Sequence, residues 1–79
     1  MSQLLSHIQN GQQVEILSIA SSVLRVKLLE MGLLEGQSIR VLFRAPLGDP
    51  IAIAINGHLL SLRISEAELV TVSNNEVEA

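Results

Sequence analysis

Few side chains in this sequence could hold a metal ion or move a proton. Histidine occurs only at His7 and His58, and eight residues are acidic, Asp49 and Glu66 among them. Imidazole and carboxylate groups are ligands of divalent transition metals, so His58, Asp49 and Glu66 could converge on one ion. Nothing in their spacing requires this, because His58 follows an Asn-Gly pair, where a histidine side chain is ordinarily solvated. We therefore predict no metal site.

The residues needed for covalent or acid–base catalysis are also missing. Such chemistry requires a nucleophile beside a base, or two carboxylates in one pocket, and the sequence has no nucleophile elbow. Gly32 and Gly36 are followed by no Gly-Lys-Ser/Thr, so no phosphate-binding loop is predicted. The absence of cysteine excludes disulfides, thiolate nucleophiles and Cys-ligated metal sites. We predict no enzymatic activity, no catalytic residue and no cofactor.

Composition restricts the class of partner. The formal net charge is −3, with five Lys and Arg residues and a single aromatic residue, Phe43. Nucleic-acid binding requires a basic face, often with aromatic stacking platforms, so it is not expected. The longest apolar run, residues 51–55, is far shorter than the ~20 residues that span a bilayer, and the N-terminal residues do not resemble a signal peptide. We expect a cytoplasmic protein with no direct membrane insertion.

The strongest local pattern is a β-hairpin that follows the loop Ala45-Pro46-Leu47-Gly48-Asp49-Pro50. The Asn56-Gly57 pair predicts a two-residue type I′ turn, which pairs Ile55 with His58 and so sets the register. Paired residues share a face of the sheet. The hairpin therefore has a core face and a small, weakly polar outer face, consisting respectively of Ile51, Ile53, Ile55, His58, Leu60 and Leu62, and of Ala52, Ala54, Leu59, Ser61 and Arg63.

The remaining elements are shorter patterns. Residues 4–11 form a helical turn, and the alternation over 13–19 and 37–44 predicts two strands. A helix is expected over 23–31, with Ser21-Ser22 as an N-cap pair and Gly32 as a left-handed C′ residue. Residues 64–67 form a turn or short 3₁₀ segment capped by Ser65, and 69–72 form the last strand. The residues expected to point inward from the first two strands are Val14, Ile16, Ile39, Val41 and Phe43.

These patterns combine into one small domain. We expect residues 1–79 to form a single unit, with an ordered core over 4–73 and a frayed acidic tail over 74–79. About five short strands, with one helix between the first two, must curl to bury one face. The predicted fold is mainly β, a small and partly open barrel of the SH3-like type.

The apolar content exceeds what such a small core can bury. Hydrophobic residues make up 48% of the 79 residues, and a chain of this length buries only about 60% of its unfolded surface. The excess should face a partner or a second copy of the chain. On the helix, Leu24, Leu28 and Met31 form a core stripe, and Val23, Val26 and Leu29 form a second stripe. This second stripe either packs under a neighbouring loop or binds a partner.

The loop before the hairpin contributes two further candidates for partner binding. Leu47 is apolar at the tip of a Pro-Gly loop, so it either folds back over the barrel end or contacts a partner. Asp49 can accept backbone N–H groups and hold the loop, which is its more ordinary role. The predicted partner-binding residues are Val23, Val26, Leu29, Leu47 and Asp49.

Several of these motifs together resemble the FeoA family, ferrous iron transport protein A. The resemblance covers roughly residues 4–73 and is carried by Met31-Gly32-Leu33, Gly36, Val41-Leu42, the loop 45–50, and Leu62-Arg63 before Ser65-Glu66-Ala67. Glu35 stands where the family often has proline, and His58 where an aromatic residue is common. The resemblance implies an SH3-like fold and an accessory role in bacterial ferrous iron uptake, with the membrane GTPase transporter FeoB as partner.

Two functional hypotheses follow. The first is a protein interaction module that docks on FeoB and modulates its iron uptake or GTPase cycle, recruited through that partner to the inner face of the membrane. The alternative is a module that binds or senses Fe²⁺ and changes its assembly in response. Self-association into a homo-oligomer through Ala52, Ala54 and Leu59 is compatible with either hypothesis.

Overall fold

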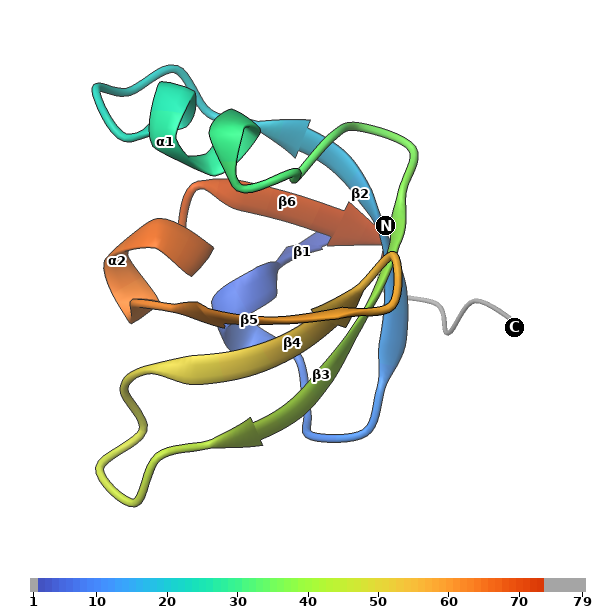
Figure 1. Cartoon of the computed structure of the whole chain (residues 1–79), viewed down its shortest axis with the longest axis vertical. Coiled ribbons are helices and arrows are strands. Elements are labelled where there is room, and N and C mark those ends of the chain that lie inside the picture. Colours follow the sequence, from blue (N-terminus) through green and yellow to red (C-terminus); the bar gives the residue numbers. More distant parts are fainter. Residues whose placement is uncertain (1, 74–79) are drawn as a thin grey trace.

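The computed structural model describes residues 2–73, which form six strands, two short α-helices and one 3₁₀ turn (Figure 1). The predicted acidic tail, 74–79, lies outside the described residues. The strand at the N-terminus was not predicted. The elements in chain order are β1 (Ser2–Leu4), η1 (Leu5–His7), β2 (Gln13–Ile19), α1 (Arg25–Glu30), β3 (Ser38–Arg44), β4 (Ile51–Ile55), β5 (His58–Leu62), α2 (Ile64–Ala67) and β6 (Val70–Ser73).

All six strands belong to one antiparallel sheet in the order β1-β6-β2-β3-β4-β5. The sheet curls around a single aliphatic core, with α1 and α2 on the same side (Figure 1). Leu5 from η1, Leu28 from α1 and Ala67 from α2 are fully buried with the strand residues. Among residues 2–73, no helix is long and apolar enough to cross a membrane.

The β4–β5 hairpin has the predicted register. Ile55 pairs with His58, and each following pair agrees through Ile51 with Leu62. Asn56 and Gly57 have φ values of 52° and 77°, as a type I′ turn requires. The isoleucines and Leu62 are buried, whereas His58 is exposed and Leu60 only half-buried, because β5 is the last strand of the sheet.

The prediction that Phe43 points inward is wrong. Val41 pairs with Ile53, but Phe43 pairs with Ala52, so Leu42 is an extra residue in β3. Such a bulge shifts the alternation of side chains by one residue. Phe43 therefore joins the outer face of the hairpin, where its side chain is 56% exposed. Val14, Ile16, Ile39 and Val41 are buried as predicted.

The first helix is shorter than the predicted span 23–31. Ser22 Oγ accepts the Leu24 N–H at 3.1 Å, and residues 23–24 form a turn before α1 begins. The end is as predicted: Gly32 has φ 102°, and the Leu33 N–H donates to the Leu28 carbonyl at 3.1 Å. This is a Schellman motif, which requires a left-handed residue at Gly32.

The second short helix is capped differently from the prediction. Glu66 Oε1 accepts the Arg63 N–H at 2.9 Å, whereas Ser65 is exposed. A glutamate at the third helical position can reach back to the N-cap N–H, as in a capping box. The cap is therefore the Glu66 carboxylate and not the Ser65 hydroxyl.

Candidate protein interaction surface

Two loops and two helices lie along one side of the curled sheet, with α2 between α1 and the loop that joins β3 to β4 (Figure 1). In Figure 1 the turn before α1, α2 and the loop between β3 and β4 all lie on the left side of the molecule. Val23 in the turn is 95% exposed, and Leu47 in the loop is 96% exposed. Val26 and Leu29 on α1 are also exposed. We call these four residues together with Asp49 the loop-end surface.

The exposure of the second stripe on α1 follows from how the helix is anchored. Only Leu28 of α1 is fully buried, with Leu33 after the helix buried beside it in the core. A helix of six residues has room for one buried stripe. Val26 and Leu29 point to other sides, and no neighbouring loop buries them. Of the two interpretations of this stripe, packing under a loop is therefore not observed.

Leu47 lies in a tightly bonded loop. The Gly48 N–H donates to the Ala45 carbonyl at 2.7 Å, and the Ala45 N–H donates to the Pro50 carbonyl at 3.0 Å. Gly48 has φ 90°, a conformation that a glycine adopts without strain. The leucine side chain does not fold back over the barrel end, so the loop holds an apolar side chain in solvent.

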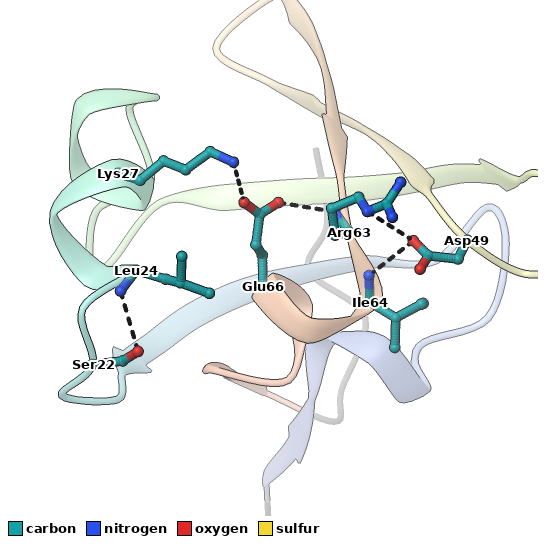
Figure 2. Close-up of polar contacts among 7 residues, drawn as sticks. All are labelled: Ser22, Leu24, Lys27, Asp49, Arg63, Ile64 and Glu66. Carbon is teal, nitrogen blue, oxygen red and sulfur yellow. Dashed lines mark hydrogen bonds and ion pairs between the residues drawn. The ribbon is translucent and has the colours of Figure 1, made fainter.

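A chain of polar contacts joins the elements behind this surface (Figure 2). Lys27 Nζ on α1 lies 2.5 Å from Glu66 Oε2 on α2. Asp49 Oδ1 in the loop accepts the Ile64 N–H of α2 at 3.1 Å and lies 4.0 Å from Arg63 Nε. The contacts therefore link α1 to α2 and α2 to the loop. The elements that carry the two exposed apolar tips, Val23 and Leu47, are thus both attached to one short helix.

Glu66 is the central residue of these contacts and is only 3% exposed. The hydrogen bond from Lys27 lowers the pKa of this carboxyl, and the Arg63 N–H lowers it further; burial raises the pKa but is outweighed. The ionised form is thus the one that the fold stabilises. Because both of its oxygens are bonded, Glu66 supports the structure and is not available to a ligand.

Asp49 takes part in a longer-range contact than the sequence suggested. The expected partners were N–H groups within its own loop, but the carboxylate accepts an N–H fifteen residues away, at the start of α2. A carboxylate at a helix N-terminus satisfies a donor that has no partner within the helix. Its position beside the exposed Leu47 keeps it a candidate for partner contact.

A second apolar feature was missed because it depends on the bulge in β3. A pocket of about 220 Å³ opens on the outer face of β3, β4 and β5. Phe43 lines it only because the bulge turns this side chain outward. Periodicity alone carries no signal for such a register change. The lining residues are Phe43, Ala45, Pro50, Ile51, Ala52, Leu59, Leu60 and Ser61.

The residues considered for metal binding are not brought together. Asp49 lies in the loop before β4 and His58 at the turn end of β5, so they are at opposite ends of the hairpin. The two carboxylate oxygens of Glu66 contact the Lys27 ammonium group and the Arg63 N–H. Within the described range 2–73, no three His, Asp or Glu residues form a group that could hold a metal ion.

The fold and the loop-end surface define a small, mainly β domain, in which an open curled sheet of six strands carries exposed apolar side chains at its loop end. Comparison with known proteins identifies its family. The FeoA domain matches residues 3–74, and the chain therefore belongs to the FeoA family, which is linked to ferrous iron transport.

Relatives of this chain include free and fused proteins. It is 36% identical over 69 residues to an Fe(2+) transport protein A/Fe(2+) transporter FeoB fusion protein of Porphyromonas gingivalis, covering 86% of this chain. The chain spans only 8% of that protein's length.

Solved structures show the same fold. The FeoA protein of Chlorobium tepidum is 42% identical, with a TM-score of 0.82 over 90% of this chain and 69% of that one. The FeoA of Stenotrophomonas maltophilia, solved with zinc and described as a prokaryotic SH3 domain protein, is 25% identical, with a TM-score of 0.79 over 90% and 89% of the two chains. The predicted SH3-like class is confirmed.

Proposed function

We propose that this protein docks on the cytoplasmic side of a FeoB-type membrane iron transporter through the loop-end surface and modulates its iron uptake or GTPase cycle. The observation that carries the proposal is the nearly complete exposure of Val23 and Leu47 on elements held by one polar network. Apolar side chains carried on a well-held backbone contribute to affinity, because little backbone freedom is lost when a partner covers them.

The relationship to a fusion protein supports the choice of partner. In the Porphyromonas gingivalis protein, a segment similar to this chain and the FeoB transporter belong to one polypeptide. Linking two modules covalently raises their effective concentration and favours contacts that are weak when the modules are free. A surface with few exposed apolar anchors suits such a contact.

A binding measurement tests the proposal directly. The purified protein is titrated against the soluble GTPase region of a cognate FeoB transporter, and the dissociation constant is measured by calorimetry. We expect Leu29→Asp and Leu47→Asp to weaken binding by about tenfold or more, because each places a charge in an apolar contact. Leu17→Asp is the matched control, since Leu17 is an exposed leucine of β2 outside this surface.

Circular dichroism and amide spectra establish that each variant keeps the fold. Unchanged affinity in folded Leu29→Asp and Leu47→Asp would remove the loop-end surface as the contact. An effect of Leu17→Asp equal to theirs would show that the contact lies elsewhere.

A further inference from the structure

The outermost strand β5 has an open backbone edge. It pairs only with β4 among residues 2–73 and ends the sheet. In a hairpin with a two-residue turn, the pair beside the turn, here Ile55 and His58, exchanges hydrogen bonds, and alternate pairs then do the same. Leu59 and Ser61 belong to the other set, so their N–H and C=O groups point away from β4.

The sequence of β5 lacks the features that usually protect an edge strand against pairing. Natural edge strands are kept short, bent by bulges, or interrupted by lysine or proline. The opposite edge follows this rule, because β1 is only three residues long. β5 is five residues long, pairs regularly over its whole length, and has no lysine, proline or acidic residue.

The outer face of β5 offers side chains of defined chemistry. Leu59, Ser61 and Arg63 alternate along this face, and Leu59 is 65% exposed beside the apolar pocket. The Arg63 side chain is 67% exposed, with Asp49 at 4.0 Å as its ion-pair contact. The Arg63 N–H is bonded to Glu66, so the free backbone edge ends before Arg63.

We propose that β5 binds an extended segment of a partner protein by antiparallel strand addition. Opposite-charge and apolar cross-strand pairs stabilise sheets. The segment therefore carries an acidic residue opposite Arg63, a small polar residue opposite Ser61 and a large apolar residue opposite Leu59. Backbone hydrogen bonds to Leu59 and Ser61 provide affinity, and the side chains provide specificity for the sequence of the segment.

Charge complementarity favours such a segment over a second copy of this chain. Because β5 contains no carboxylate, pairing of two β5 edges places no acidic side chain of either strand opposite Arg63. Each chain also has a formal net charge of −3, which disfavours association of two copies. An acidic residue within an otherwise apolar extended segment supplies the carboxylate opposite Arg63 that a second copy lacks.

The test uses the full chain and a blocked seven-residue peptide, acetyl-Lys-Glu-Val-Thr-Val-Leu-Lys-amide. Its glutamate, threonine and leucine take the three positions in antiparallel order. We expect saturable shifts of the Leu59 and Ser61 amide signals and slower hydrogen exchange at both. A peptide with glutamate and leucine interchanged is the control and should bind more weakly.

Three variants separate backbone pairing from side-chain contact. Ser61→Pro removes an outward N–H at an edge position that tolerates proline, and we expect about tenfold weaker binding. Ser61→Ala keeps the N–H and loses only the hydroxyl contact, so it should bind within about threefold of the original chain and more tightly than Ser61→Pro. In Arg63→Gln, the preference for the glutamate peptide over a glutamine peptide, roughly threefold in the original chain, should disappear.

Three results would overturn the proposal. The first is absence of binding at millimolar peptide. The second is equal binding by a folded Ser61→Pro variant, which would exclude strand addition. The third is concentration-dependent dimerisation of the free chain, abolished by Ser61→Pro, which would make a second copy the occupant of the edge. Binding of FeoB through the loop-end surface is measured separately with Leu47→Asp, so either proposal can fail alone.

Discussion

At the scale of single residues, Glu66 has the most consequences, because it is a buried carboxylate bonded on both oxygens. Lys27 and the Arg63 N–H favour its ionised form, and its pKa is lowered in spite of burial. An acid whose pKa is lower in the folded than in the unfolded chain adds stability above the unfolded pKa. That contribution is lost as the pH falls through the folded pKa.

Glu66→Gln should therefore change how stability depends on pH. We expect the variant to lose about 1 kcal/mol of unfolding free energy at pH 7, where the charge-assisted contact is replaced by a neutral one. The loss is small because the Lys27 side chain is more than half exposed, so solvent screens its charge. Urea unfolding between pH 7 and pH 3 measures the effect.

The pH dependence of the difference in unfolding free energy shows whether the contribution of Glu66 is electrostatic. The pKa of an unfolded glutamate is about 4.3, so the difference in stability between the two proteins should persist above that pH and shrink below it. Glu35→Gln, an exposed residue, is the control and should behave as the original chain does. A constant difference at every pH would show that the contribution of Glu66 is not electrostatic.

The alternative hypothesis of Fe²⁺ binding depends on His58. Its side chain is exposed at the hairpin turn and far along β5 from the Asp49 end. A single imidazole is a weak site for Fe²⁺, so we expect no micromolar binding in anoxic titration calorimetry, and no change in His58→Ala. Micromolar binding that His58→Ala abolishes would instead support the metal-sensing alternative.

At the scale of elements, local patterns predicted what local interactions determine. Asn56-Gly57 sets the β4–β5 register by backbone conformation alone, and Gly32 ends α1 for the same kind of reason. The bulge at Leu42 could not be predicted, because it depends on how β3 fits against β4. Because the bulge was not predicted, the outward position of Phe43 and the pocket beside β5 were not predicted either.

The loop-end surface likewise has some features that local sequence predicts and one that depends on a long-range contact. Exposure of Val23, Val26, Leu29 and Leu47 was open to prediction, because a short helix and a Pro-Gly loop leave apolar residues without a core. The contact between Asp49 and the Ile64 N–H joins residues fifteen positions apart, and no periodicity encodes it.

The Schellman motif gives an element-scale prediction. Gly32→Ala should destabilise the protein by about 1–2 kcal/mol, the cost of a left-handed conformation for a residue with a Cβ. A Cβ at Gly32 would meet no atom within 4 Å, so the cost comes from the backbone and not from a clash. Urea unfolding measures it, with the exposed Ser21→Ala as control. A loss below about 0.5 kcal/mol would mean that the helix end rearranges.

At the scale of the whole molecule, the apolar excess divides into two surfaces. The loop-end surface is carried by α1 and the β3–β4 loop, whereas Phe43 and Leu59 lie on the outer face of the sheet. The polar network ties the first surface to α2, and the second depends on strand pairing. The two proposed contacts therefore use different surfaces of this small domain.

A double-variant experiment tests whether the loop-end surface acts as one contact. Val23→Asp and Leu47→Asp alter apolar tips on different elements, and each should weaken binding to the FeoB GTPase region by about tenfold. If a single partner surface covers both tips and the two residues do not touch, their free-energy losses should add to within about 0.5 kcal/mol, so the double variant should bind roughly a hundredfold more weakly. Calorimetry at equal ionic strength measures all four proteins. If one tip alone accounts for the whole loss, the contact is limited to that tip, and the other tip is free for a different partner.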